Sequence, residues 1–125
     1  MVFGCSPPVD TELAELAARQ FHESYNRGNF TTIYANASPV FQDFVSENKF
    51  IRLLRKLHTR LGKHKNSTLI NWSAKSSTRG GVLITLVYDA VYDSDDRTQA
   101  SFTFRINNGL ARLYNFNVSS QLLRK

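Results

Sequence analysis

The fold is decided by the stretch Gln99-Ala100-Ser101-Phe102-Thr103-Phe104-Arg105-Ile106-Asn107, in which apolar and polar residues alternate. A period of two places all the apolar side chains of a β-strand on one face of its sheet. This apolar face must be shielded from water, and the residues that precede it in the chain predict amphipathic helices that could pack on it. We therefore expect an antiparallel sheet with helices packed on one face. The apolar side of the stretch consists of Ala100, Phe102, Phe104 and Ile106.

Three helices are predicted before the first strand. The first begins near Asp10 and ends at Gly28, and the last begins at Ser46 and ends at Gly62, because glycine readily adopts the left-handed conformation that ends a helix. A short second helix and a turn starting at Ser38 lie between them. The apolar stripe of the last helix is predicted to hold Phe50, Leu53, Leu54, Leu57 and Leu61.

After Gly62 the apolar period changes from helical to two, which predicts four strands. The first contains Thr68, Ile70, Trp72 and Ala74, the second runs from Val82 to Tyr92, the third is the opening stretch, and the fourth runs from Leu110 to Ser119. Asn108-Gly109 is a strong signal for a type I′ hairpin turn between the last two strands. Helices followed by strands indicate an α+β domain.

The turn at Asn108-Gly109 also predicts the register of the last two strands. A buried amide without a partner costs about 1–3 kcal/mol, so asparagine on an apolar face needs an explanation. Three alternatives are open for Asn115 and Asn117 of the last strand: their amides line a pocket, they satisfy backbone groups, or a bulge rotates them outward. If they line a pocket, the candidate ligand-lining residues are Trp72, Tyr88, Asn115 and Asn117. The predicted facing pairs are Phe104–Leu113, Phe102–Asn115 and Ala100–Asn117.

The 125 residues are expected to form one domain, residues 10–125, behind a flexible tail at residues 1–9. Cys5 is the single cysteine, so no internal disulfide can form. It follows Gly4 and precedes Ser6-Pro7-Pro8, an arrangement that resembles the end of a bacterial lipoprotein signal. Cys5 is therefore the lipidation candidate, and the alternative is a cysteine in an unstructured N-terminus.

Two surfaces are candidate partner sites. The net charge of +6 is compatible with binding to an anionic membrane, and the outer face of the last helix carries a basic stripe that could make this contact. The alternative is that this charged face is simply solvated. No aromatic platform is interleaved with the cations, so no nucleic-acid partner is expected. The outer sheet face, with Val87, Val91, Tyr114 and Phe116, is the candidate homodimer surface. The basic stripe consists of Lys49, Arg52, Lys56 and Arg60.

The sequence predicts no catalytic residue, metal site or cofactor. No carboxylate falls in the inward register of the strands, and proton transfer needs a titratable group within reach of the substrate. His22, His58 and His64 do not have a metal-ligand spacing and are interpreted as surface or capping residues.

Several segments resemble small bacterial lipoproteins with a nuclear-transport-factor-2-like, cystatin-like domain. They are residues 28–38, Phe41, Phe50, the helix end at residues 57–62, and residues 114–119. The resemblance covers roughly residues 11 to 123. It implies a cone in which three helices pack in a curved four-stranded antiparallel sheet, with a cavity at the wide end and a lipid anchor at Cys5.

The leading functional hypothesis is a non-enzymatic, lipid-anchored domain on the periplasmic side of the cell envelope, acting in binding or assembly. The alternative is a small-molecule binder or enzyme that uses the cone cavity. A third hypothesis is a cytoplasmic protein that begins at Met1. The sequence does not identify the ligand or the partner.

Overall fold

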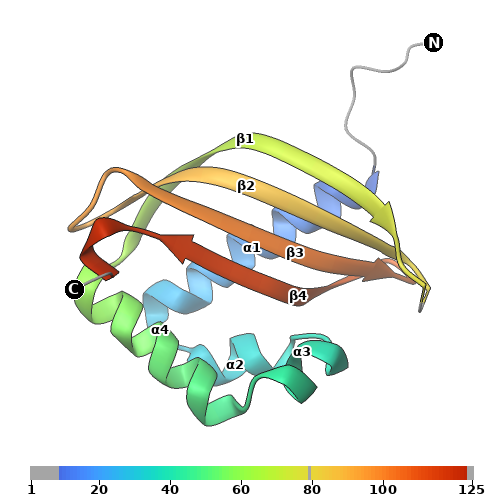
Figure 1. Cartoon of the computed structure of the whole chain (residues 1–125), viewed down its shortest axis with the longest axis horizontal. Helices are drawn as coiled ribbons and strands as arrows, with labels where there is room; N and C mark the ends of the chain where they lie inside the picture. The colour runs from blue at the N-terminus through green and yellow to red at the C-terminus, as the bar shows by residue number, and fades with distance from the viewer. Residues whose placement is uncertain (1–8, 79, 124–125) are drawn as a thin grey trace.

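The computed structural model describes residues 9–78 and 80–123, and shows helices followed by one antiparallel sheet (Figure 1). The predicted α+β class is confirmed. The turn at Ser38 continues as a six-residue helix, so four α-helices precede the sheet in the part of the chain that the structure describes. The helices are α1 (Val9–Arg27), α2 (Phe30–Ala35), α3 (Pro39–Phe44) and α4 (Glu47–Leu61). The strands are β1 (His64–Ser76), β2 (Val82–Tyr92), β3 (Thr98–Asn107) and β4 (Leu110–Ser119), followed by the 3-10 turn η1 (Gln121–Leu123).

The helix ends form where the sequence predicts them. The Ser38 side chain accepts a hydrogen bond from the Phe41 amide at 3.2 Å, which caps α3. Ser46 caps α4 in the same way. Gly28 and Gly62 follow α1 and α4 with φ angles of 76° and 80°, a conformation that costs a residue with a Cβ atom.

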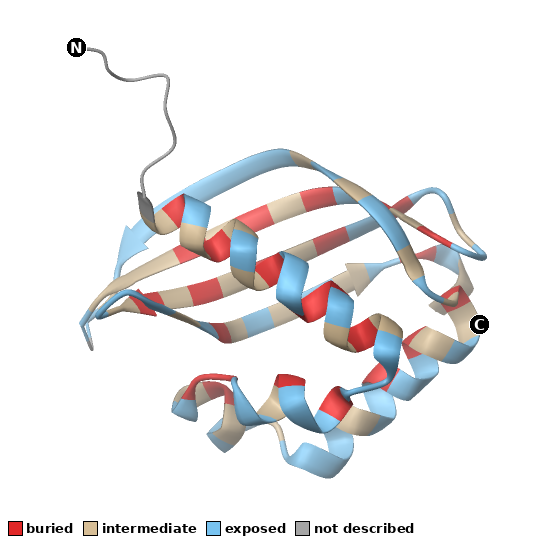
Figure 2. Cartoon of the chain, turned by 180° about the vertical axis from the view of Figure 1, so that it is seen from behind, coloured by how far each residue is buried: buried red, intermediate tan, exposed pale blue. Residues whose placement is uncertain are grey.

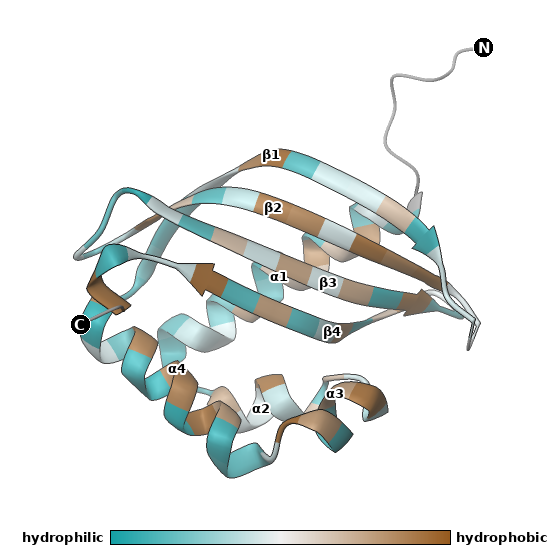
Figure 3. Cartoon of the chain, in the orientation of Figure 1, coloured by the Kyte–Doolittle hydropathy of each residue, from teal (hydrophilic) through white to brown (hydrophobic). Residues whose placement is uncertain are grey.

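The strands are paired in the order β1-β2-β3-β4, and the sheet curves over α1 (Figure 1). Asn108 and Gly109 both have positive φ angles, as the predicted type I′ turn requires. Seen from behind, α1 lies across the sheet and carries buried residues at intervals along its length (Figure 2). Hydrophobic segments run along β2, and α4 alternates between hydrophobic and hydrophilic residues (Figure 3). Sheet and helices therefore share one core, centred on Phe21, Phe50, Leu86 and Phe102.

The register of β3 and β4 departs from the prediction after one pair. Phe104 faces Leu113 as expected, but Thr103 faces Asn115, so Tyr114 is an extra residue in β4. Such an insertion is a β-bulge, and it turns every later residue of the strand to the opposite face.

The bulge corrects the predicted positions of both asparagines. Phe116, not Asn115, lies opposite Phe102, with their ring centroids 5.1 Å apart, and Asn115 and Asn117 are exposed. The prediction that they share the face of Phe102 is wrong, and the alternative of a bulge is the one observed. Phe116 accordingly leaves the predicted outer-face patch and packs on the core. The observed pairs are Phe102–Phe116 and Ala100–Val118.

β1 has two register shifts, one between His64 and Asn66 and one between Leu69 and Asn71. Because of the shift at Leu69, the four residues predicted to share one face of this strand do not do so: Thr68 pairs with Asp89, whereas Trp72 pairs with Leu86. Residues 70–76 are exposed throughout, and β1 is an edge strand of the sheet. The stripe of α4 is also narrower than predicted, since Leu53 is exposed.

Candidate functional site: a groove between α1 and β1

A groove with a volume of about 310 Å³ lies between α1 and β1 and reaches β2. We call it the α1–β1 groove. Six of its eight lining residues are polar or charged, which distinguishes it from the core beside it. The lining residues are Glu15, Ala18, Arg19 and His22 from α1, His64, Ser67 and Leu69 from β1, and Tyr88 from β2.

Helix and strand periodicity bring these residues together. The four residues of α1 follow the spacing i, i+3, i+4 and i+7, which places them on one side of a helix. On the strands, Leu69 pairs with Tyr88 and Ser67 pairs with Ala90, which is buried. Facing residues of antiparallel strands point to the same side of the sheet, so the strand residues of the groove face α1.

Two stacked histidines form one end of the groove. The His22 and His64 rings are nearly parallel, with an angle of 2° between their planes and 3.5 Å between their centroids. His64 Nε2 shares a hydrogen bond of 2.5 Å with the Ser67 hydroxyl. His22 is only 7% exposed, and its Nε2 has no hydrogen-bond partner within the described part of the chain.

Both imidazoles are neutral at physiological pH. Burial, reinforced by His64, lowers the pKa of His22 to about 3. Burial likewise lowers the pKa of His64 to about 4. Neutral rings can stack without the repulsion that two imidazolium ions would suffer, and each retains one donor and one acceptor nitrogen.

Asn26 holds the start of β1 against the end of α1. Its Oδ1 accepts a hydrogen bond from the His64 amide at 2.8 Å, and its Nδ2 donates to the His64 carbonyl at 2.9 Å. The side-chain amide thus pairs with the backbone of His64 much as a neighbouring strand would. This double contact fixes the backbone that carries the His64 ring over His22.

Tyr88 supplies a hydroxyl to the groove that Glu15 and Arg19 also line. The residue is 7% exposed, and its hydroxyl has no hydrogen-bond partner among residues 9–78 and 80–123. Burial raises the pKa of Tyr88 to about 12, with Glu15 acting in the same direction and Arg19 in the opposite one. The hydroxyl is therefore protonated at neutral pH, and both charged side chains lie close enough to affect it.

The structure does not bring the four predicted ligand-lining residues together. Tyr88 lies in the groove. Trp72 is 41% exposed and does not line it, and Asn115 and Asn117 are exposed on β4.

The sequence interpretation missed most of the groove. His22 and His64 were expected at the surface or at helix caps, but His22 is buried and both belong to the stack. The spacing of the α1 residues was a usable signal. However, opposite charges one helical turn apart, such as Glu15 and Arg19, are also typical of an ordinary solvated helix face, so the spacing alone does not indicate a groove.

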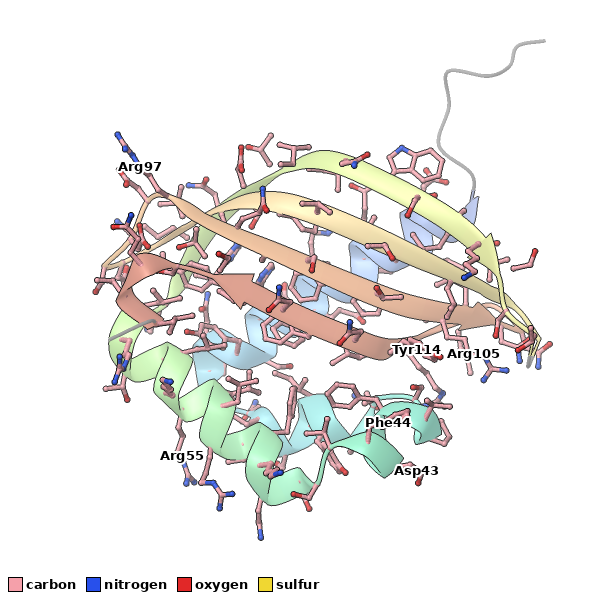
Figure 4. The ribbon with its side chains drawn as sticks, viewed as in Figure 1. Asp43, Phe44, Arg55, Arg97, Arg105 and Tyr114 are labelled. Atoms are coloured by element: carbon pink, nitrogen blue, oxygen red, sulfur yellow. The ribbon has the colours of Figure 1, made fainter. Side chains whose placement is uncertain are left out.

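The basic stripe of α4 is only partly available to a partner. Lys49, Arg52 and Lys56 are exposed. Arg60 is half-buried, and its Nη1 donates a hydrogen bond of 3.1 Å to the Leu122 carbonyl, which attaches η1 to α4. The neighbouring Arg55 extends from α4 away from the sheet (Figure 4). Cys5 lies outside the described residues.

No protein-family model matches the chain, and no curated protein matches its sequence. Within the described ranges, no group of three or more His, Cys, Asp or Glu side chains is arranged to hold a metal ion. No helix there is long and apolar enough to cross a membrane.

Proposed function

We propose that this chain is a non-enzymatic binding domain that holds a small polar molecule in the α1–β1 groove. The observation that carries the proposal is a buried polar atom without a partner in the lining of the groove, His22 Nε2. Buried polar groups in native proteins nearly always have partners, and one left without costs about 1–3 kcal/mol. A ligand in the groove would supply that partner and would also reach the Tyr88 hydroxyl.

The pKa values of the groove favour binding over acid–base catalysis. A general base is most effective when its pKa is near the operating pH. The pKa values of His22 and His64, about 3 and about 4, make both imidazoles weak bases, and the pKa of Tyr88, about 12, makes it a weak acid. Hydrogen bonding to a ligand requires no change of protonation state, so all three groups are suited to it.

A matched pair of variants tests the groove. Ser67 lines it, whereas Thr68 pairs with Asp89 on the opposite face of the sheet. A library of small polar molecules, screened by ligand-observed NMR, should yield compounds that bind the wild-type chain and Thr68→Phe but not Ser67→Phe. Equal binding to both variants, or no binding compound, would contradict the proposal. Circular dichroism would confirm that both variants fold.

We further propose that the domain is nuclear-transport-factor-2-like and acts at the cell envelope, anchored through Cys5. The support is the residue pattern at Cys5, the sequence resemblance, and the order of helices before a curved four-stranded sheet. Labelling bacteria with an alkyne fatty acid should tag the natural gene product and leave Cys5→Ser untagged. A wild-type product without label would contradict the anchor.

A further inference from the structure

We infer that the ligand of the α1–β1 groove is a small zwitterion, with its ammonium group held by Glu15 and its carboxylate held by Arg19. The inference rests on the proposed binding function and names the class of molecule. It starts from two opposite charges that line one groove from a single helix.

Glu15 and Arg19 are available to a ligand. They are four residues apart on α1, so their Cβ atoms are separated by about 5–6 Å on the same side of the helix. Neither has a hydrogen bond or an ion pair within the described ranges. Because the two imidazoles beside them are neutral, the groove carries one positive and one negative charge and no net charge.

Both charges line the same groove as Tyr88. Both affect the pKa of Tyr88, in opposite directions, so both side chains lie near this phenol. A molecule bound beside Tyr88 would therefore lie near both a carboxylate and a guanidinium. Tyr88 can donate to, or accept from, either end of that molecule.

A zwitterion fits this arrangement better than an ion of one sign. An anion would be attracted by Arg19 and repelled by Glu15, whereas a cation would be attracted by Glu15 and repelled by Arg19. Juxtaposed like charges reduce affinity, so the groove discriminates against both. Its volume of about 310 Å³ is at the lower end of the range for ligand pockets, roughly 300–1,000 Å³, and therefore favours a small molecule.

Three probes separate the contributions of the two charges. They are 4-aminobutyrate, whose ammonium and carboxylate are joined by three methylene groups, butyrate, which has only the carboxylate, and butylamine, which has only the ammonium. Affinities are measured with the full chain by following its backbone amide resonances in NMR titrations. We expect 4-aminobutyrate to bind at least tenfold more tightly than either analogue and to shift the amides of Ser67 and Tyr88.

Variants of α1 supply the controls. Glu15→Gln and Arg19→Gln should each weaken binding of 4-aminobutyrate at least tenfold, and Glu15→Gln should also abolish its advantage over butyrate. Glu23 and Arg27 form an exposed pair with the same spacing on α1 and do not line the groove. Glu23→Gln and Arg27→Gln should leave the affinity unchanged.

The outcomes distinguish the ligand class from the binding function. Equal affinity for the three probes, or equal effects of the groove and control variants, would overturn the zwitterion and leave the function intact. No groove shift with any probe at 50 mM would also overturn the zwitterion. The function would then be judged by the Ser67→Phe and Thr68→Phe screen.

Discussion

The rings of His22 and His64 stack in parallel, with centroids 3.5 Å apart, and join α1 to the start of β1. The stack is also one end of the proposed binding groove. A proton on either ring would place a charge in a buried contact between two imidazoles, so the structure depends on both remaining neutral. Stability and binding should therefore share a dependence on pH.

The free energy of unfolding should fall as the pH is lowered from 7 to 4. The unfolded chain takes up protons at its histidines near pH 6.5, whereas the folded pKa values of His22 and His64 are about 3 and about 4. The unfolded state thus binds more protons throughout this window, and stability is lost as the pH drops. At about 1.4 kcal/mol per pKa unit, the loss from His22 is on the order of 3 kcal/mol at pH 4. Urea denaturation at pH 7, 5.5 and 4 would measure it.

His22→Phe separates this contribution from the other titrations of the chain. It keeps a ring in the stack but removes the proton, so the loss between pH 7 and pH 4 should shrink by roughly half, and the remainder comes mainly from His64. Asp95 has a pKa lowered chiefly by the Ser120 hydroxyl, and its contribution is lost below the ordinary carboxyl pKa of 3.8. Asp95→Asn should therefore leave the histidine window unchanged. Parallel pH profiles of wild type and His22→Phe would show that the stack does not titrate as described.

Asn26→Ala should destabilise the chain by about 1–3 kcal/mol, because two partly buried backbone hydrogen bonds of His64 lose their partner. It should also loosen the stack and raise the pKa of His64 toward its ordinary value of 6.5. Chemical denaturation and an NMR titration of the His64 ring would measure the two effects. A destabilisation with the His64 pKa unchanged would show that Asn26 does not position the ring.

Gly62→Ala should cost more stability than Gly28→Ala. Both glycines have left-handed φ angles, so each substitution introduces backbone strain of about 1–2 kcal/mol. A Cβ atom at Gly62 would also lie 2.7 Å from the Cβ atom of Asp93, whereas one at Gly28 would meet nothing within 4 Å. Gly62 also has a ψ angle of −156°, outside the left-handed helical region, which adds strain at that position. Thermal unfolding of the two variants would measure the combined difference. Equal losses would argue against the close approach of Gly62 to Asp93.

Phe116→Ala should destabilise the chain by about 3 kcal/mol, because the Phe116 ring packs on Phe21 and Phe102. Asn117→Ala should change stability by less than about 0.5 kcal/mol, since its side chain is exposed. Comparing the two variants by urea denaturation tests the bulge in β4. The unbulged register would reverse the order of the two effects.

Most of the fold was predictable because its signals are local. The alternation in β3 predicts a strand with one apolar face, and a serine or glycine at a helix end acts through its immediate neighbours. The Asn108-Gly109 turn likewise predicted the first facing pair, Phe104 with Leu113. These features require only a few consecutive residues and no knowledge of the tertiary structure.

The groove was not predictable in the same way, because it depends on irregularities and long-range contacts. One extra residue, Tyr114, turns Asn115 and Asn117 to the opposite face of β4. The alternation of residues does not reveal this bulge, because the strand has aromatic residues on one face whether or not the bulge is present. The burial of His22 depends on His64, which lies 42 positions further along the chain. That contact exists only once β1 is placed beside α1.

The most direct test of the binding groove is a side-chain NMR titration of the histidine and tyrosine resonances with compounds found in the library screen. The groove predicts saturable shifts of the His22, His64 and Tyr88 ring signals, with one affinity for all three and no such shifts in Ser67→Phe. Compounds whose shifts map instead to the cavity of about 80 Å³ beside Phe104 and Leu113, or to the outer sheet face, would contradict the α1–β1 groove as the binding site.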